Sequence, residues 1–263
     1  MSKYELMAKS ISRMTVLQDM NEKGTTSRAK TTRGILTGAK YDKYTEEEKK
    51  LIGMAQINYW AYAKHIYITE GIGDVGINEI RERVLKHIRI MKKAPVVIID
   101  YLQILAPADV RATDKQNTDR AVLELKRLSR DYNIPVIGIS SFNRDNYNAP
   151  VNLASFKESG AIEYSSDVLI GLQYDGMDYR EGEADKTRDK RIRKLRKKAI
   201  EDAKKGRAVK VQAHVLKNRN GGKDDALFDF YPMFNLFSET KMGQDELEAF
   251  EDLGEGDWES ISE

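Results

Sequence analysis

The stretch Val96-Val97-Ile98-Ile99-Asp100-Tyr101-Leu102-Gln103 decides the predicted fold of this chain. Four β-branched apolar residues follow Pro95 and run into Asp100 without a polar interruption. A run this short and this apolar predicts a strand buried on both faces of a parallel sheet, with helices on each side. Asp100 would then lie at the carboxyl end of that strand, where α/β sheets bind ligands. A carboxylate there can hold Mg²⁺ against nucleotide phosphates, although for this stretch alone a cap on the next turn is the commoner role.

The bulk composition limits the class of protein. Hydrophobic residues make up 40% of the 263 residues and charged residues 33%, which is enough for a core beneath a charged surface. No stretch approaches the roughly 18 apolar residues of a membrane span, and the first residues do not resemble a signal peptide. The sequence contains no Cys, which excludes disulfides and thiolate metal sites. We therefore expect a cytoplasmic protein with no membrane partner.

The net charge of +2 conceals a strong local asymmetry. Residues 186–207 carry 12 Lys and Arg against 3 Asp and Glu, while residues 244–263 carry 9 acidic residues and no basic ones. The basic segment lies in an insertion, residues 175–207, whose spaced apolar residues predict a helix. A solvated helical excursion and a DNA-binding arm both fit this pattern. Residues 239–263 are predicted to form an acidic, disordered tail.

The order of local patterns predicts an α/β fold. Helical patterns are expected at residues 2–20, 45–64, 77–91 and 114–132, and strands at residues 65–69, 96–99, 134–140, 168–173, 209–216, 226–231 and 234–237. The alternation of strands and helices predicts a doubly wound, mostly parallel sheet. From residue 209 onward, short turns such as Asn220-Gly221-Gly222 predict that the fold ends in an antiparallel hairpin or meander.

Four separated segments carry a more specific pattern: residues 97–103, 134–144, 156–163 and 216–221. The first resembles, nearly residue for residue, the Walker B sequence of the C-terminal ATPase domain of DnaB-type replicative DNA helicases. The other three follow in the family's order and at family-like spacing. The resemblance covers about residues 1–238. It implies a RecA-like ATPase domain that acts as a ring, a hexamer, on single-stranded DNA with ATP and Mg²⁺.

The resemblance implies catalytic roles for three residues. Asp100 would position Mg²⁺ on the nucleotide. Arg219, together with Lys217, would reach across the subunit interface to the γ-phosphate of a neighbouring subunit, which makes hydrolysis depend on assembly. The plainer interpretation of Arg219 is an ordinary cation of a hairpin turn.

Two further groups of site residues follow from the same resemblance. Nucleotide sensing would fall to Gln103, Asn143 and Arg144, with the Tyr101 ring beside the phosphate edge. Lys157, Glu158 and Gly160 would follow the phosphate backbone of single-stranded DNA. The plainer alternatives are that Asn143 forms a turn and that Lys157 and Glu158 are an exposed charged pair.

The sequence lacks the G-x-x-x-x-G-K-[ST] loop that grips nucleotide phosphates. In the resembled family this Walker A loop, the strand before it and a second strand ending in the catalytic glutamate precede the helix that begins near Met1. We therefore expect an N-terminally incomplete domain that hydrolyses little ATP alone, with the Walker A part lost or supplied by a separate chain. The phosphate-loop strand is expected between the strands that end at Asp100 and begin near Ile134, so its absence would leave both with unpaired edges.

Two departures from the family keep other functions open. Ser141 stands where the family usually has Gln, and Lys157 replaces an Arg and so loses a bidentate fork. One alternative is a degenerate RecA-like module that binds DNA or a partner without hydrolysis. The other is a RecA-like recombination ATPase, which would not be expected to combine the patterns at residues 157–163 and 217–221. Whether the chain alone is an enzyme stays open.

Overall fold

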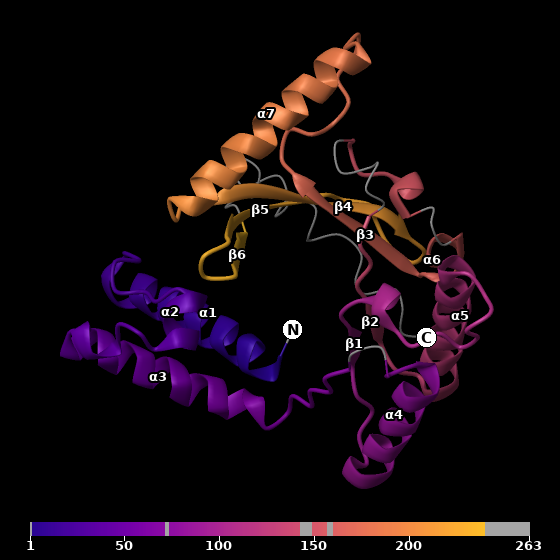
Figure 1. The fold of residues 1–263 in the computed structure, drawn as a ribbon, viewed down its shortest axis with the longest axis horizontal. Helices are drawn as coiled ribbons and strands as arrows, with labels where there is room; N and C mark the ends of the chain where they lie inside the picture. Colours follow the sequence, from indigo (N-terminus) through magenta and orange to yellow (C-terminus); the bar gives the residue numbers. More distant parts are fainter. Residues whose placement is uncertain (1, 72–73, 143–148, 157–159, 240–263) are drawn as a thin grey trace, which may run out of the picture.

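A computed structural model describes residues 2–71, 74–142, 149–156 and 160–239, and Figure 1 shows the arrangement of its helices and strands. The first elements form a helical unit of α1 (Lys3–Lys23), α2 (Thr32–Thr37), the short 3₁₀ helix η1 (Tyr41–Lys43) and α3 (Glu46–Ala63). Capping boxes at Ser2 and Thr45 fix where α1 and α3 begin. Ile11, Ala55 and Tyr59 form the buried core between these two helices.

A parallel pair of strands follows this helical unit. After α4 (Ile77–Met91) come β1 (Val97–Ile99), η2 (Leu102–Ile104), α5 (Asp114–Tyr132) and β2 (Val136–Gly138). β1 pairs directly with β2, with Val97 opposite Val136 and Ile99 opposite Gly138. The expectation that a phosphate-loop strand separates these two strands is therefore wrong. Backbone hydrogen bonds from Val97 N to Pro135 O (3.0 Å) and from Ile139 N to Ile99 O (2.9 Å) already occupy the facing edges.

The remaining strands form an antiparallel sheet. It contains β3 (Val168–Tyr174), β4 (Val209–Asn218), β5 (Ala226–Tyr231) and β6 (Leu236–Glu239), in that order. The short helices η4 (Leu153–Phe156) and α6 (Gly160–Ser165) precede β3, and the basic insertion is helical, as predicted, over α7 (Asp185–Lys204). The α/β class with a parallel and an antiparallel part is confirmed, and within the described residues its parallel part is the single pair β1–β2.

The strand predicted at residues 65–69 is not present. Residues 66–70 have no regular structure, and Ile66 and Tyr67 are 47% and 60% exposed. A β pattern becomes a strand only when a neighbouring strand takes its hydrogen bonds, and neither sheet of the described chain includes this segment. The segment therefore has the apolar residues of a strand but no partner among the described strands.

One hydrophobic core covers a single face of both sheets. Its buried members come from α4, β1, η2, α5, α6, β3 and the segments between them: Val84, Ile99, Leu102, Leu125, Leu128, Ile134, Phe156, Ile162 and Leu169. Figure 1 shows α5 and α6 gathered along one side of these strands. The core therefore joins the parallel pair to the antiparallel sheet, although none of the described strands is hydrogen-bonded to both.

The opposite face of the parallel pair and of β3 is apolar and exposed in the described part of the chain. We call this set the open face; its members and their exposed fractions are Ile98 65%, Ile137 52%, Val168 50%, Ile170 52% and Leu172 51%. Along β3 exposed and buried residues alternate strictly as far as Gln173. The expectation that the strand before Asp100 is buried on both faces is wrong for the same reason, since Ile99 is buried and Ile98 is not. Strands of this apolar kind are normally covered on both sides.

No helix in the described part of the chain has the length and apolar character needed to cross a bilayer. The acidic segment predicted to be disordered, apart from Glu239, falls outside the described residues.

Candidate nucleotide site

The carboxyl ends of β1 and β2 bring several polar side chains to one edge. Asp100 follows β1 directly, is exposed, and has a cis peptide bond to Tyr101. Gln103 reaches across to the end of β2, where its Nε2 donates to Ser140 Oγ at 2.8 Å and to the Ser141 carbonyl at 3.5 Å. The structure thus places the predicted metal ligand and one predicted sensing residue at the same edge of the parallel pair.

The turn after Asp100 is fixed by Leu102. Its backbone N–H donates to the Ile139 carbonyl at 2.9 Å, and its side chain is 6% exposed within the core. Gly138 leaves room for this packing: a Cβ at that position would lie 3.1 Å from Leu102 Cδ2, so the Leu102 side chain would have to shift slightly. With Leu102 held inward, its neighbours Tyr101 and Gln103 are left exposed at the strand ends.

The donors at this edge suit one side of a Mg²⁺ site. Mg²⁺ is usually held by one or two carboxylates together with water and phosphate oxygens rather than by a complete protein cage. Asp100 provides a carboxylate that hydrogen-bonds to no residue in the described ranges, and no group of three or more potential ligands occurs within those ranges. The geometry therefore fits a metal shared with a bound phosphate. The described residues contain no phosphate cradle.

Lys217 and Arg219 lie at a different place, the carboxyl end of α6. Lys217 Nζ donates to the Glu163 carbonyl at 2.7 Å, and Arg219 Nη2 donates to the Tyr164 carbonyl at 3.1 Å. Cations at a helix carboxyl terminus stabilise its unpaired carbonyl groups. The two predicted catalytic cations are thus engaged within their own chain, and no described contact joins them to Asp100.

Asp167 completes this second cluster. Its Oδ1 accepts from Arg219 Nη1 at 3.1 Å, and it also forms an ion pair with Lys126 of α5. The hydrogen bond from Lys126 lowers the pKa of Asp167, and burial opposes the shift only in part. The cluster connects the end of β4 to α5 and α6. No local sequence pattern predicts this contact between distant segments.

The remaining predicted site residues are only partly described. Gly160 begins α6, where the next residue, Ala161, donates its N–H to Asp119 Oδ1 at 3.2 Å. The other four predicted residues, Asn143, Arg144, Lys157 and Glu158, lie outside the described residues. Sequence reasoning missed Ser140, the hydrogen-bond partner of Gln103. No local sequence pattern signals this contact, because it depends on the direct pairing of β1 with β2.

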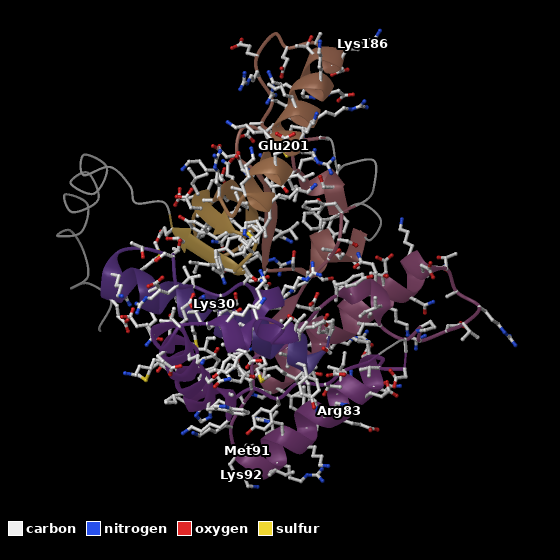
Figure 2. The ribbon with its side chains drawn as sticks, turned by 60° about the vertical axis from the view of Figure 1, so that its left-hand side comes forward. Lys30, Arg83, Met91, Lys92, Lys186 and Glu201 are labelled. Carbon is white, nitrogen blue, oxygen red and sulfur yellow. The ribbon has the colours of Figure 1, made fainter. Side chains whose placement is uncertain are left out.

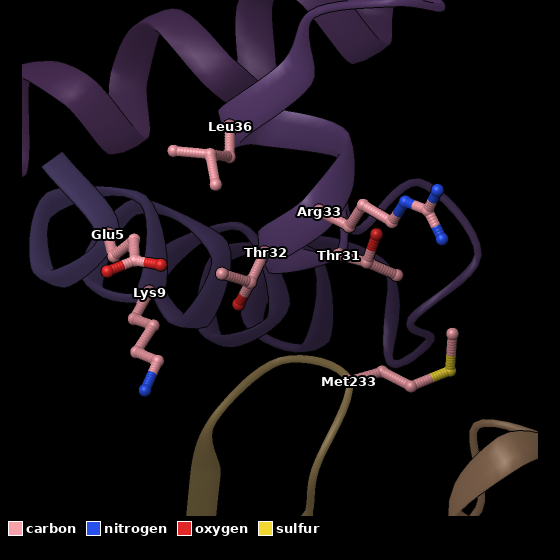
Figure 3. A pocket seen from close by; sticks show the side chains of 7 residues that line it. All are labelled: Glu5, Lys9, Thr31, Thr32, Arg33, Leu36 and Met233. Atoms are coloured by element: carbon pink, nitrogen blue, oxygen red, sulfur yellow. The ribbon is translucent and has the colours of Figure 1, made fainter. Parts of the chain in front are cut away.

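A surface pocket of about 730 Å³ lies elsewhere, between the helical unit and the antiparallel sheet (Figure 3). It is lined by Glu5, Lys9, Thr31, Thr32, Arg33, Leu36 and Met233. The Thr32 N–H donates to the Met233 carbonyl at 3.1 Å, and Asn235 Nδ2 donates to Thr32 Oγ1 at 2.8 Å. The pocket thus marks the junction of α2 with the β5–β6 turn and contains none of the predicted site residues.

The fold, with a parallel pair ending in a carboxylate and a separate antiparallel sheet, is similar to the fold of solved helicase ATPase domains. A solved structure described as an ATPase domain superimposes with a TM-score of 0.65 at 20% identity, covering 92% of this chain and 72% of that one. A DnaB-like replicative helicase, described with its interactions with primase, gives a TM-score of 0.65 at 19% identity, covering 92% and 49%.

The family follows from the sequence comparison. The DnaB-like helicase C terminal domain model matches residues 1–239, so the chain belongs to that family. The replicative DNA helicase DnaB of Helicobacter pylori strain 26695 is 29% identical over 187 residues, which are 63% of this chain and 37% of the relative. That of Pasteurella multocida is 31% identical over 134 residues, 48% and 27% of the two chains. The chain therefore spans well under half the length of these relatives.

Proposed function

We propose that this chain is part of an ATP-dependent DNA helicase that acts in replication as a ring, a hexamer, on single-stranded DNA in the cytoplasm. The observation that carries the proposal is the edge formed by Asp100, Gln103 and Ser140 at the ends of two adjacent parallel strands. A carboxylate at the carboxyl end of a parallel strand lies where α/β sheets bind ligands, and in phosphoryl-transfer ATPases such a carboxylate holds Mg²⁺ on the nucleotide.

The domain is completed by a polypeptide segment outside these 263 residues. Among the described strands β2 pairs only with β1, and β3 only with β4, so each has one edge that can accept another strand. Both edges lie over the same core, and both strands contribute apolar side chains to the open face. A strand that pairs here, bears the phosphate-binding loop at its carboxyl end and leads into a helix over the open face would meet both needs.

Each site residue then has a defined task. Asp100 would hold Mg²⁺, and that metal, when bound, would offset the negative charge of the phosphates. Gln103 senses the nucleotide and passes its state to Ser140 at the end of β2, toward Asn143 and Arg144. Lys157, Glu158 and Gly160 follow the DNA backbone. Arg219, supported by Lys217, exchanges its contacts at α6 for the phosphate of a neighbouring subunit, which requires the ring to form.

The test uses a completed chain, defined as this sequence preceded by the Helicobacter pylori DnaB segment that corresponds to the phosphate-loop strand, the loop, the helix after it and the second strand that ends in the catalytic glutamate. We expect ATP hydrolysis that single-stranded DNA stimulates and that Asp100→Asn abolishes. The present chain should hydrolyse little ATP under the same conditions. Equal turnover by the completed chain and its Asp100→Asn variant would contradict the proposed role of this edge.

A second candidate is a non-hydrolysing RecA-like module that binds DNA or a partner. It is favoured by Ser141 in place of a sensing amide and by the engagement of Lys217 and Arg219 at the end of α6. If the completed chain binds Mg-ATP and DNA but does not turn over, this second function is the correct one.

A further inference from the structure

The basic helix α7 stands apart from the site described above. Figures 1 and 2 show it projecting from the antiparallel sheet, with Lys186 at its tip and Glu201 nearer the sheet. In Figure 2 the tip lies at the opposite end of the molecule from Lys92, which follows α4.

One side of α7 is firmly anchored. Ile192 is fully buried and Ala199 is 8% exposed. Arg191 binds the preceding segment by three contacts: an ion pair to Glu183 at 2.7 Å, a hydrogen bond to the Asp178 carbonyl at 2.8 Å, and another to the Gly176 carbonyl. The helix is therefore held in one orientation by buried contacts, and it is more than a solvated excursion of the chain.

Most cations of α7 fall into two sets by their contacts. Arg188 and Arg191 are used internally: Arg188 pairs with Asp185 at 2.8 Å and stacks over Tyr179 at 4.8 Å, and Arg191 pairs with Glu183. The second set, which we call the basic row, is exposed and has no ion pair with a described residue: Lys186, Lys190, Arg193, Lys194, Lys197 and Lys198. The helix thus neutralises the cations near its anchored side and leaves the outward ones unneutralised.

The spacing of the basic row makes it continuous. Lys186, Lys190, Arg193 and Lys197 recur every three or four residues, so they lie along one side of the helix over about 16 Å at 1.5 Å per residue. Like charges at this spacing repel one another. An extended anion with many charges relieves that repulsion along its whole length, whereas a single small anion does not.

We propose that the basic row of α7 binds the sugar–phosphate backbone of nucleic acid without reading its sequence. The row offers long cations and no large apolar side chain among them, which suits phosphate contacts and gives a bilayer nothing to bury. The inference rests on α7 alone and does not require the nucleotide site to function.

The test is binding of the full chain to a fluorescent 30-nucleotide thymidine oligomer over a salt series. Reversing three charges, Lys190→Glu, Arg193→Glu and Lys197→Glu, should weaken binding at least tenfold at low salt. The slope of log affinity against log salt should fall by about 2, because each lost phosphate contact on a single strand removes about 0.7. The matched control is Lys86→Glu, Arg89→Glu and Lys93→Glu on and just after α4, which makes the same net charge change and should leave affinity within about twofold at matched salt.

Three results would overturn the proposal. One is an equal loss in the α7 variant and the control, which would indicate a general charge effect. Another is unchanged binding in the α7 variant while circular dichroism shows both variants folded. The third is binding that is absent from the full chain and emerges only when residues 244–263 are deleted, which would make the acidic segment of the chain itself the occupant of α7.

Discussion

Two neighbouring isoleucines of β1, Ile98 and Ile99, differ sharply in burial. Ile98 is 65% exposed on the open face, whereas Ile99 is 7% exposed in the core. We would replace each by Thr, which keeps the β-branched shape and the preference for strands. The two substitutions are chemically identical and adjacent, so only the burial of the side chain differs.

The expected magnitudes follow from the exposed fractions. Full burial of an isoleucine stabilises a protein by about 1.5–3 kcal/mol, and a buried hydroxyl without a partner costs a further 1–3 kcal/mol, roughly. Ile99→Thr should therefore lower the free energy of unfolding by about 3 kcal/mol or more. Ile98→Thr should lower it by less than about 1 kcal/mol, because most of its side chain is already in water. Urea unfolding followed by circular dichroism measures both.

The same pair should behave differently in the completed chain. There the added helix would cover Ile98, so Ile98→Thr should approach the cost of Ile99→Thr. If both substitutions lowered the free energy of unfolding of the present chain equally, Ile98 could not be exposed, because the open face would already be covered. A cost of Ile98→Thr that does not rise in the completed chain would refute the proposed position of the added segment.

Three other predictions follow from particular contacts. Arg28→Ala should destabilise the chain by about 3–5 kcal/mol in urea unfolding, because it leaves the fully buried Asp19 without its ion pair at 2.7 Å. Burial raises the pKa of Asp19, but hydrogen bonds from Arg28 outweigh this effect and lower the pKa. The stability that this ionised carboxylate contributes is complete above about pH 4 and is lost as the pH falls further. Asp19→Asn should therefore flatten the acid limb of a pH–stability curve. Arg219→Ala in the completed chain should reduce ATP turnover about 10³-fold or more while nucleotide affinity stays within a few fold, and equal losses of both would argue against a role in trans.

Elements defined by local chemistry were predictable from the sequence. The helices Ile77–Met91 and Asp114–Tyr132 and the strand Ala226–Tyr231 have the bounds predicted for them. The helix at Asp114 is delimited by a capping box at Thr113 and by Asn133 in the left-handed conformation, with φ 48°. Such signals act within a few residues, so the sequence displays them directly.

Features that depend on distant neighbours were not predictable. The direct pairing of Val97 with Val136 joins strands separated by α5, and hydrophobic patterns do not encode which strands become neighbours. Residues 65–69 have the composition of a strand but lack a partner among the described strands. Asp100 follows a strand directly, as predicted, while the use of Arg219 at the end of α6 depends on a contact 55 residues away in sequence.

In the proposed function, Asp100 contributes one half of a nucleotide site whose other half comes from a phosphate-loop segment. The most direct measurement is titration calorimetry of Mg-ATP with the present chain, the completed chain and the completed chain bearing Asp100→Asn. We predict submillimolar affinity only for the completed chain with Asp100 intact. Submillimolar affinity of the present chain alone, or undiminished affinity after Asp100→Asn, would contradict the claim.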